Sequence, residues 1–140
     1  MKKEKDIPHQ IDAVVRPVIV CLCGSTRFKD EFVKANLRET LEEKIVLSIG
    51  CDMRTDSEIF GMTSSDQEVW TEEQREIKRK LDELHKRKID LADEVLVLNV
   101  GGYIGKSTRS EIEYAEIHGK RIRYLEAPTL GCIGTEWSRM

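Results

Sequence analysis

The sequence predicts an α/β fold built around a parallel sheet. Short apolar runs alternate along the chain with longer segments in which apolar residues recur every three or four positions. Parallel strands need crossovers of helical length between them, and strands covered by helices on both faces are continuously apolar. At 140 residues and 39% apolar content, the chain has the size of one domain with a substantial core.

Four apolar runs are the predicted strands. Residues 18–23 read Val-Ile-Val-Cys-Leu-Cys and end at a glycine, which is typical of a central strand buried on both faces. The other three runs cover residues 45–49, 93–99 and 121–125. Together they predict a small sheet of parallel strands.

Three helices are predicted between these strands, over about 28–43, 67–89 and 107–118. The first helix is expected to pack on the sheet through an apolar stripe. Its members are Phe28, Phe32, Val33, Leu37 and Leu41. The second helix is rich in charge, which favours a solvated face opposite its own apolar stripe. That stripe consists of Trp70, Ile77, Leu81, Leu84 and Leu91. Gly119 is expected to cap the third helix.

The remaining segments flank or interrupt a single domain that spans residues 17–126. Residues 1–16 are polar and are predicted to be flexible, and residues 127–140 form a C-terminal tail. The stretch 51–66 is too long for a simple turn and carries Asp52. Such a loop either folds over a ligand or is a solvated excursion.

Composition disfavours several classes of function. The chain has 23 basic and 26 acidic residues, so no field of one sign is available to attract a nucleic acid polymer. No stretch approaches the roughly 18 apolar residues of a membrane span, and no apolar signal segment follows the charged start. We therefore expect a cytoplasmic protein without a membrane partner.

The four cysteines lack the spacing of metal ligands, so we expect reduced thiols and no bound metal. They are Cys21, Cys23, Cys51 and Cys132. Neither a P-loop nor a dinucleotide fingerprint is present, so no cofactor is expected.

The tripeptide Ser-Thr-Arg occurs twice, each time where a predicted strand gives way to a helix, at 25–27 and 107–109. In a parallel sheet such turns gather along one edge, where ligands bind. The first turn combines close backbone approach, two hydroxyls, a helix start and a guanidinium group, a set that suits phosphate. Its members are Gly24, Ser25, Thr26 and Arg27. Alternatively, its hydroxyl residues only cap the helix.

The second turn adds further candidates. Gly105, Ser107 and Thr108 extend the predicted phosphate site, while Tyr103, Ile104 and Asp52 are candidate contacts for a sugar or base. Glu111 lies one turn inside the third helix. It is either a nucleophile directed at an electrophilic carbon or the partner of Thr108 in a capping box.

Two segments of the chain resemble the nucleoside 2-deoxyribosyltransferase superfamily. Residues 93–115 end in Ser-Thr-Arg-Ser-Glu-Ile-Glu-Tyr-Ala and are similar to the segment of that family that carries its glutamate. Residues 23–27 resemble the Cys-Gly-Ser-Ile-Arg turn of its 2'-deoxynucleoside 5'-phosphate N-hydrolase branch. The two turns occur in the family's order and on the expected elements.

The resemblance implies a flavodoxin-like or Rossmann-like three-layer sandwich with four or five parallel strands. It also implies cleavage or transfer at the N-glycosidic bond of a nucleoside or nucleoside 5'-phosphate, with Glu111 as the nucleophile. Ser25, Arg27 and Ser107 would hold the phosphate. Members of the family are homo-oligomers, so the resemblance implies at least a dimer.

The chain departs from the family pattern at three places. Cys21-Leu22-Cys23 stands where the family commonly has a tyrosine, and Glu113 stands where it has a glycine. The family's aspartate on the second helix aligns with His85, and Asp82 or Asp90 could take that place only in another register. His85 either donates a proton to the departing base or is packed at the edge of the core. These departures favour the alternative function, a nucleotide-binding or sensing module with weak catalysis.

Overall fold

The computed structural model describes residues 15–49 and 70–127. Asp52, most of the segment predicted to be flexible, the predicted loop and nearly all of the tail lie outside this part of the chain. None of the helices in the described part has the length and apolar character that a bilayer span requires.

The described residues form a sheet of four parallel strands. These are β1 (Ile19–Cys23), β2 (Ile45–Leu47), β3 (Glu94–Val97) and β4 (Arg121–Tyr124). Their order across the sheet is β2-β1-β3-β4, and every neighbouring pair is parallel. This is the order of a flavodoxin-like sheet, so the predicted fold class is confirmed.

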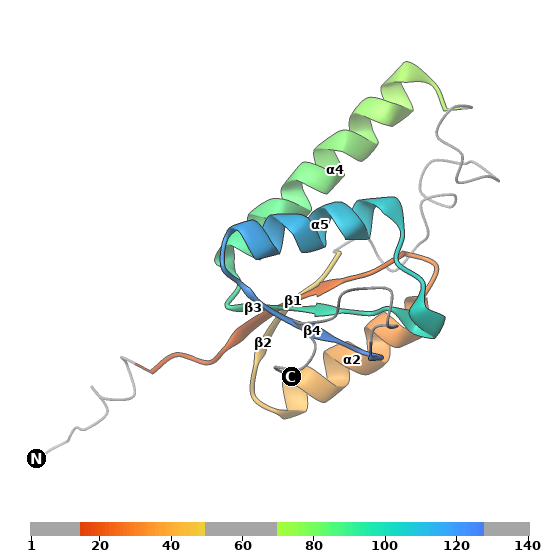
Figure 1. The fold of residues 1–140 in the computed structure, drawn as a ribbon. Coiled ribbons are helices and arrows are strands. Elements are labelled where there is room, and N and C mark those ends of the chain that lie inside the picture. Colours follow the sequence, from red (N-terminus) through yellow and green to blue (C-terminus); the bar gives the residue numbers. More distant parts are fainter. Residues whose placement is uncertain (1–14, 50–69, 128–140) are drawn as a thin grey trace, which may run out of the picture.

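Three long helices cover the two faces of the sheet (Figure 1). Helix α2 (Lys29–Leu41) lies on one face, and α4 (Glu72–Leu91) and α5 (Lys106–Ile117) lie on the other. A short 3-10 helix, η2 (Val100–Gly102), follows β3. The result is a three-layer sandwich in which each strand must bury both of its faces.

Alternate side chains of the strands enter two separate cores. Cys21 and Cys23 of β1 lie with Val95 and Val97 of β3 in the core beneath α4 and α5. The intervening residues face α2 and meet Phe32 and Ala35 of that helix. They are Val20, Leu22, Leu96 and Leu98. The period of two along a strand explains this division, and it places both thiols of β1 on one face.

The apolar stripe predicted for α2 is wrong in its phase. Phe32 is buried as expected, but Val33, Leu37 and Leu41 are exposed at 58%, 59% and 73%. The buried positions that follow Phe32 are Ala35 and Glu39.

The phase of α4 also differs from the prediction. Leu84 and Leu91 are exposed at 53% and 66%, as is Ile77 to a smaller extent, and the buried residues of the helix are His85 and Ile89. In both helices the element was predicted correctly, while the side chain that meets the sheet was not.

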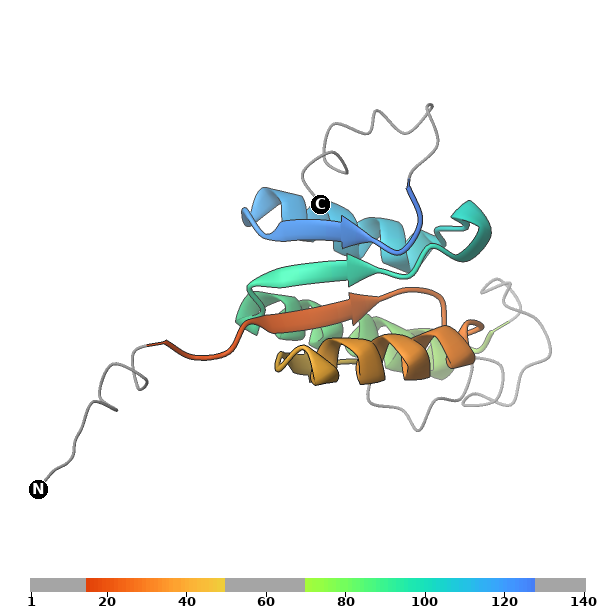
Figure 2. The ribbon, with the colours of Figure 1, turned by 90° about the horizontal axis from the view of Figure 1, so that it is seen from below.

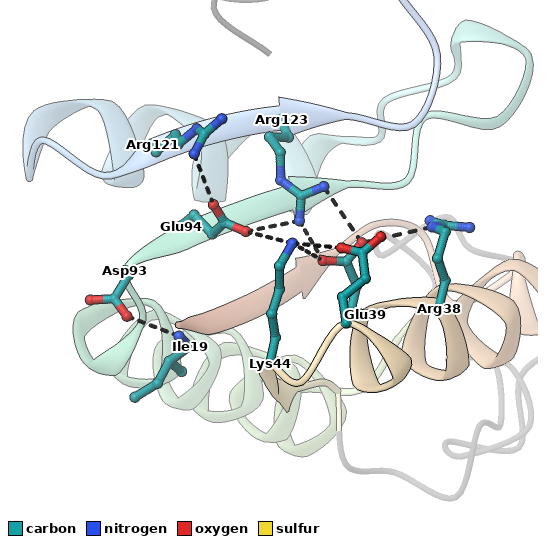
Figure 3. Close-up of polar contacts among 9 residues, drawn as sticks. Ile19, Arg38, Glu39, Lys44, Asp93, Glu94, Arg121 and Arg123 are labelled. Atoms are coloured by element: carbon teal, nitrogen blue, oxygen red, sulfur yellow. Dashed lines mark hydrogen bonds and ion pairs between the residues drawn. The ribbon is translucent and has the colours of Figure 1, made fainter. Parts of the chain in front are cut away.

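Glu39 and Glu94 are buried in a network of ion pairs near the amino ends of β3 and β4 (Figure 3). Arg123 donates to Glu39 and, at 2.9 Å, to Glu94 Oε2, while Lys44 Nζ donates to Glu39 Oε1 at 2.8 Å. Burial of Glu39 opposes its ionisation, but Arg123 and Lys44 outweigh it and hold the pKa of Glu39 below its ordinary value. The network joins the end of α2 to the sheet away from the carboxyl ends of the strands.

A second ionic contact joins the chain before β1 to the start of β3. The guanidinium of Arg16 donates to both oxygens of Asp93, at 2.7 and 2.8 Å, and the backbone N–H of Ile19 donates to Asp93 Oδ2 at 2.9 Å. Arg16 ends the segment that was predicted to be flexible, and here it is held by the domain.

Candidate functional site

The site lies where the order of the strands reverses direction. From β1 the chain crosses by α2 to β2 on one side, whereas β3 lies on the other side of β1. The loops that follow β1 and β3 therefore leave neighbouring strands toward opposite faces of the sheet, and in open α/β sheets this is where ligands commonly bind. Figure 2 shows β1, β3 and β4 pointing the same way, with the turns after them at one edge. Both Ser-Thr-Arg turns belong to this edge.

Gly24 lets the two turns pass at contact distance. A Cβ atom at this position would lie 3.1 Å from Leu98 Cβ and 3.3 Å from Leu98 O, which is tighter than ordinary packing. The backbone N–H of Leu98 also donates to Cys23 O at 2.8 Å. A larger residue would push the turn after β1 away from the end of β3.

Arg27 and Tyr103, one from each turn, are in contact. An Nη2 hydrogen of Arg27 points to the Tyr103 hydroxyl at 3.3 Å, and the guanidinium carbon lies 4.3 Å from the centroid of the tyrosine ring. Phe28 meets the same ring edge-on, with the ring centroids 6.0 Å apart. Arg27 and Tyr103 are exposed, so the structure brings together a predicted phosphate contact and a predicted base or sugar contact at an open surface.

The residue at the N-cap of α2 is Phe28, so neither Ser25 nor Thr26 occupies that position. The helix begins at Lys29 with Phe28 at the N-cap and no side-chain cap. Ser25 instead closes the turn itself: its Oγ accepts the N–H of Arg27 at 3.3 Å and its carbonyl accepts the N–H of Phe28 at 3.0 Å. The Ser25 hydroxyl is therefore used within the turn and not at the N-cap of α2.

The capping-box alternative for Glu111 is wrong. Helix α5 begins at Lys106, one residue earlier than predicted, and its N-cap is Gly105, which has no side chain to offer. Thr108 is buried within the first turn, and Glu111 is the sixth residue of the helix. The carboxyl group of Glu111 is thus not used to close the start of α5. The other end is as predicted, because Gly119 adopts a φ of +70° directly after the helix.

Asp82 and Lys78 of α4 reach the start of α5. Lys78 Nζ donates to Asp82 Oδ1 at 2.8 Å and to Ser107 Oγ at 3.1 Å, and the Ser107 hydroxyl lies 3.5 Å from Asp82 Oδ2. Asp82 precedes His85 by three residues, so the two share a face of α4. The comparison with the family aligned its aspartate with His85 and not with Asp82. The three-residue spacing of Asp82 and His85 was the signal in the sequence that could have identified Asp82. Ile104 is half-buried and packs against the core beneath α5.

Glu111 and His85 form the buried centre of the site. Their exposures are 8% and 6%, and Glu111 Oε1 lies 4.0 Å from His85 Nε2. The same nitrogen lies 3.1 Å from the carbonyl oxygen of Leu22 and 3.5 Å from the sulfur atoms of Cys21 and Cys23. His85 is therefore a packed core residue and, at the same time, the neighbour of the candidate nucleophile.

Burial and the neighbouring groups together shift the pKa values of Glu111 and His85. Burial raises the pKa of Glu111 above the ordinary value, and the positive charge of His85 only partly opposes this. Burial alone would lower the pKa of His85, but the hydrogen bond with Cys21 and the charge of Glu111 outweigh it, so that the pKa is raised. The pKa values of Glu111 and His85 are therefore both raised, that of Glu111 by burial and that of His85 by the groups around it.

The two thiols of β1 are shifted in opposite directions in pKa. A hydrogen bond from the Cys23 thiol, together with His85, holds the pKa of Cys21 well below its usual range against the effect of burial. The hydrogen bond to Cys21, burial and the charge of Glu111 raise the pKa of Cys23.

Comparisons with known proteins add no name to this geometry. The chain matches no protein-family model, and a search of curated proteins finds no match.

Proposed function

We propose that this chain belongs to the nucleoside 2-deoxyribosyltransferase superfamily and cleaves the N-glycosidic bond of a nucleoside 5'-phosphate. The observation that carries the proposal is the place of Glu111, a buried carboxyl group beside His85 on the helix that follows the switch point of the sheet. A carboxyl group with a raised pKa and a single cationic neighbour is typical of a reactive centre.

In the proposed reaction, the Glu111 carboxylate attacks the anomeric carbon and forms a glycosyl ester, while the bond from that carbon to the base breaks. His85, as an imidazolium, supplies the proton that the departing base requires. Water then attacks the anomeric carbon and gives its proton to the now neutral His85, the ester bond breaks, and the carboxylate returns with the release of the sugar phosphate. A second base in place of water would give transfer instead of hydrolysis.

The exposed turns would hold the rest of the substrate. The guanidinium of Arg27 provides paired donors for a 5'-phosphate, aided by Ser25 and the free N–H groups at the start of α5. Tyr103 already stacks on Arg27 and offers its ring to a base or ribose. The resemblance also implies a homo-oligomer, which sedimentation equilibrium would test.

One observation favours a second function, nucleotide binding with weak catalysis. His85 Nε2 is surrounded by the carbonyl of Leu22 and two sulfur atoms, all within 3.5 Å. A nitrogen held in this way is poorly placed to give its proton to a base. In that case the pocket would recognise a nucleotide and leave its glycosidic bond intact.

A panel of ribo- and deoxyribonucleosides and their 5'-monophosphates separates the two functions. Free base is measured by chromatography and binding by thermal shift, and a competing base is added to detect transfer. We expect base release that is faster from the monophosphates than from the nucleosides. Binding without release would support the binding module, and the absence of both would overturn the two proposals together.

A further inference from the structure

Two cysteines and a histidine converge on one point of the core. Cys21 and Cys23 project from the same face of β1, and His85 reaches them from α4, 62 residues beyond Cys23. One ligand atom from each lies within 4.8 Å of the other two, and all three residues are buried. The carboxyl group of Glu111 lies beside this group, 4.0 Å from the ring nitrogen, but not within 4.8 Å of all three ligand atoms.

The spacing of these atoms fits a tetrahedral metal ion. With Zn–S and Zn–N bonds of about 2.3 and 2.0–2.1 Å, a tetrahedron places sulfur and nitrogen about 3.5 Å apart. His85 Nε2 lies 3.5 Å from each sulfur atom. Thiolate and imidazole ligands select zinc over magnesium and calcium, which prefer oxygen.

We propose that Cys21, Cys23 and His85 bind a zinc ion, and that the neighbouring carboxylate of Glu111 moves toward it as the fourth ligand. Both sulfur atoms bind as thiolates, so any proton that they carry is released to solvent. His85 must carry its proton on Nδ1 so that the lone pair of Nε2 is free, and the contact of Nε2 with Leu22 O is then given up. The sequence does not reveal such a site, because Cys-x-Cys is not a familiar metal-binding spacing and the third ligand lies on a helix far along the chain.

Zinc in this site would bind the carboxylate of Glu111, which is the proposed nucleophile. This consequence rests on the proposed function, whereas the binding of zinc does not. Base release should therefore fall as zinc is added and return when a chelator removes it. A protein that binds the ion but releases no base would leave the metal site standing and overturn the proposed function alone.

Cobalt(II) is the probe for the test, because thiolate ligands give it a charge-transfer band in the near ultraviolet. The full-length, reduced, metal-free protein is titrated with Co²⁺ and then with Zn²⁺. We expect the band to saturate at one equivalent and to disappear as zinc displaces cobalt. No thiolate band at one equivalent would overturn the proposal.

The remaining cysteines supply a matched control. The double variant Cys51→Ser/Cys132→Ser should keep the band, and Cys21→Ser/Cys23→Ser should lose it while circular dichroism shows a folded protein. The reverse result would assign the ion to the other pair and overturn the site. If Cys21→Ser/Cys23→Ser fails to fold, His85→Gln serves instead. Its zinc affinity should fall by more than about 10-fold, because mutation of a residue that only supports a metal ligand already lowers affinity by that much. An unchanged affinity would contradict the assignment of His85.

Discussion

Replacement of Glu111 by glutamine should abolish base release and leave the fold intact. Glutamine has nearly the same shape, but its amide cannot form the glycosyl ester. We expect base release to fall by more than about 10³-fold, because loss of a nucleophile removes the covalent route itself.

The surroundings of Glu111 set the expected change in stability. His85 Nε2 lies 4.0 Å away, beyond hydrogen-bonding distance, and the attraction over that separation is about 4 kcal/mol at an effective dielectric constant of about 20. Taking a carboxylate out of water costs several kcal/mol, so the two terms nearly offset each other. Without Glu111, His85 can lose its proton and leaves no unpaired buried charge, so the free energy of unfolding of Glu111→Gln should stay within about 1.5 kcal/mol of the wild type.

The assay compares Glu111→Gln with Glu113→Gln, which changes an exposed glutamate on the same helix. Base release from nucleoside 5'-monophosphates is followed by chromatography in the presence of a chelator, and urea unfolding gives the stability. Glu113→Gln should match the wild type in both measurements. Base release that survives in Glu111→Gln would refute the assignment of the nucleophile, and a large loss of stability would mean that Glu111 has a structural role.

Three further predictions follow from contacts in the structure. Arg27→Ala should weaken the binding of nucleoside 5'-monophosphates by about 10-fold or more but leave nucleosides nearly unaffected, since a hydrogen bond to a charged group contributes about 1.5–3 kcal/mol; isothermal titration showing equal losses would exclude a phosphate role. Glu39→Gln should cost about 1.5–3 kcal/mol in urea unfolding, because it removes one of the two buried carboxylates that pair with Arg123 and Lys44. Exposed Glu42→Gln should cost less than about 1 kcal/mol, and similar costs would contradict this account of the network. The pKa of Asp93 is held at about 2 by Arg16 and a backbone N–H. Its contribution to the free energy of unfolding, about 1 kcal/mol for an exposed pair, is therefore complete above about pH 4 and is lost as the pH falls toward 2. The difference in stability between the wild type and Asp93→Asn should shrink over that window, and a constant difference would count against the ion pair.

The sequence was sufficient to predict the layers of this fold, because continuous apolar runs and helical spacing report strands and helices locally. The phase of α2 was not predictable in the same way. Ala35 is small enough to let the helix approach the sheet, and the burial of Glu39 depends on its pairing with Lys44 and with Arg123, which lies 84 residues away. Apolar spacing alone therefore placed Val33 and Leu37 against the sheet, where the structure has neither.

The phase of a helix also limited how much of the site could be predicted. The two turns were predicted to meet because parallel strands end at one edge, and the contact of Arg27 with Tyr103 confirms that they do. His85 was left open between two roles because Leu84 was expected to face inward. A rotation of α4 by one residue, about 100°, brings His85 onto the thiols of β1 and turns Leu84 to solvent.

The two proposals need opposite protonation states of His85, although they use the same carboxylate. Glycosidic cleavage requires a proton on the imidazole, both to balance the charge of buried Glu111 and to supply the departing base. Zinc requires the free lone pair of Nε2 and brings its own charge to Glu111 in place of that proton. The hydrogen bond with Cys21 and the charge of Glu111 raise the pKa of His85 and so favour the protonated form over the effect of burial. A rise in pH therefore weakens the state that cleaves and strengthens the state that binds metal.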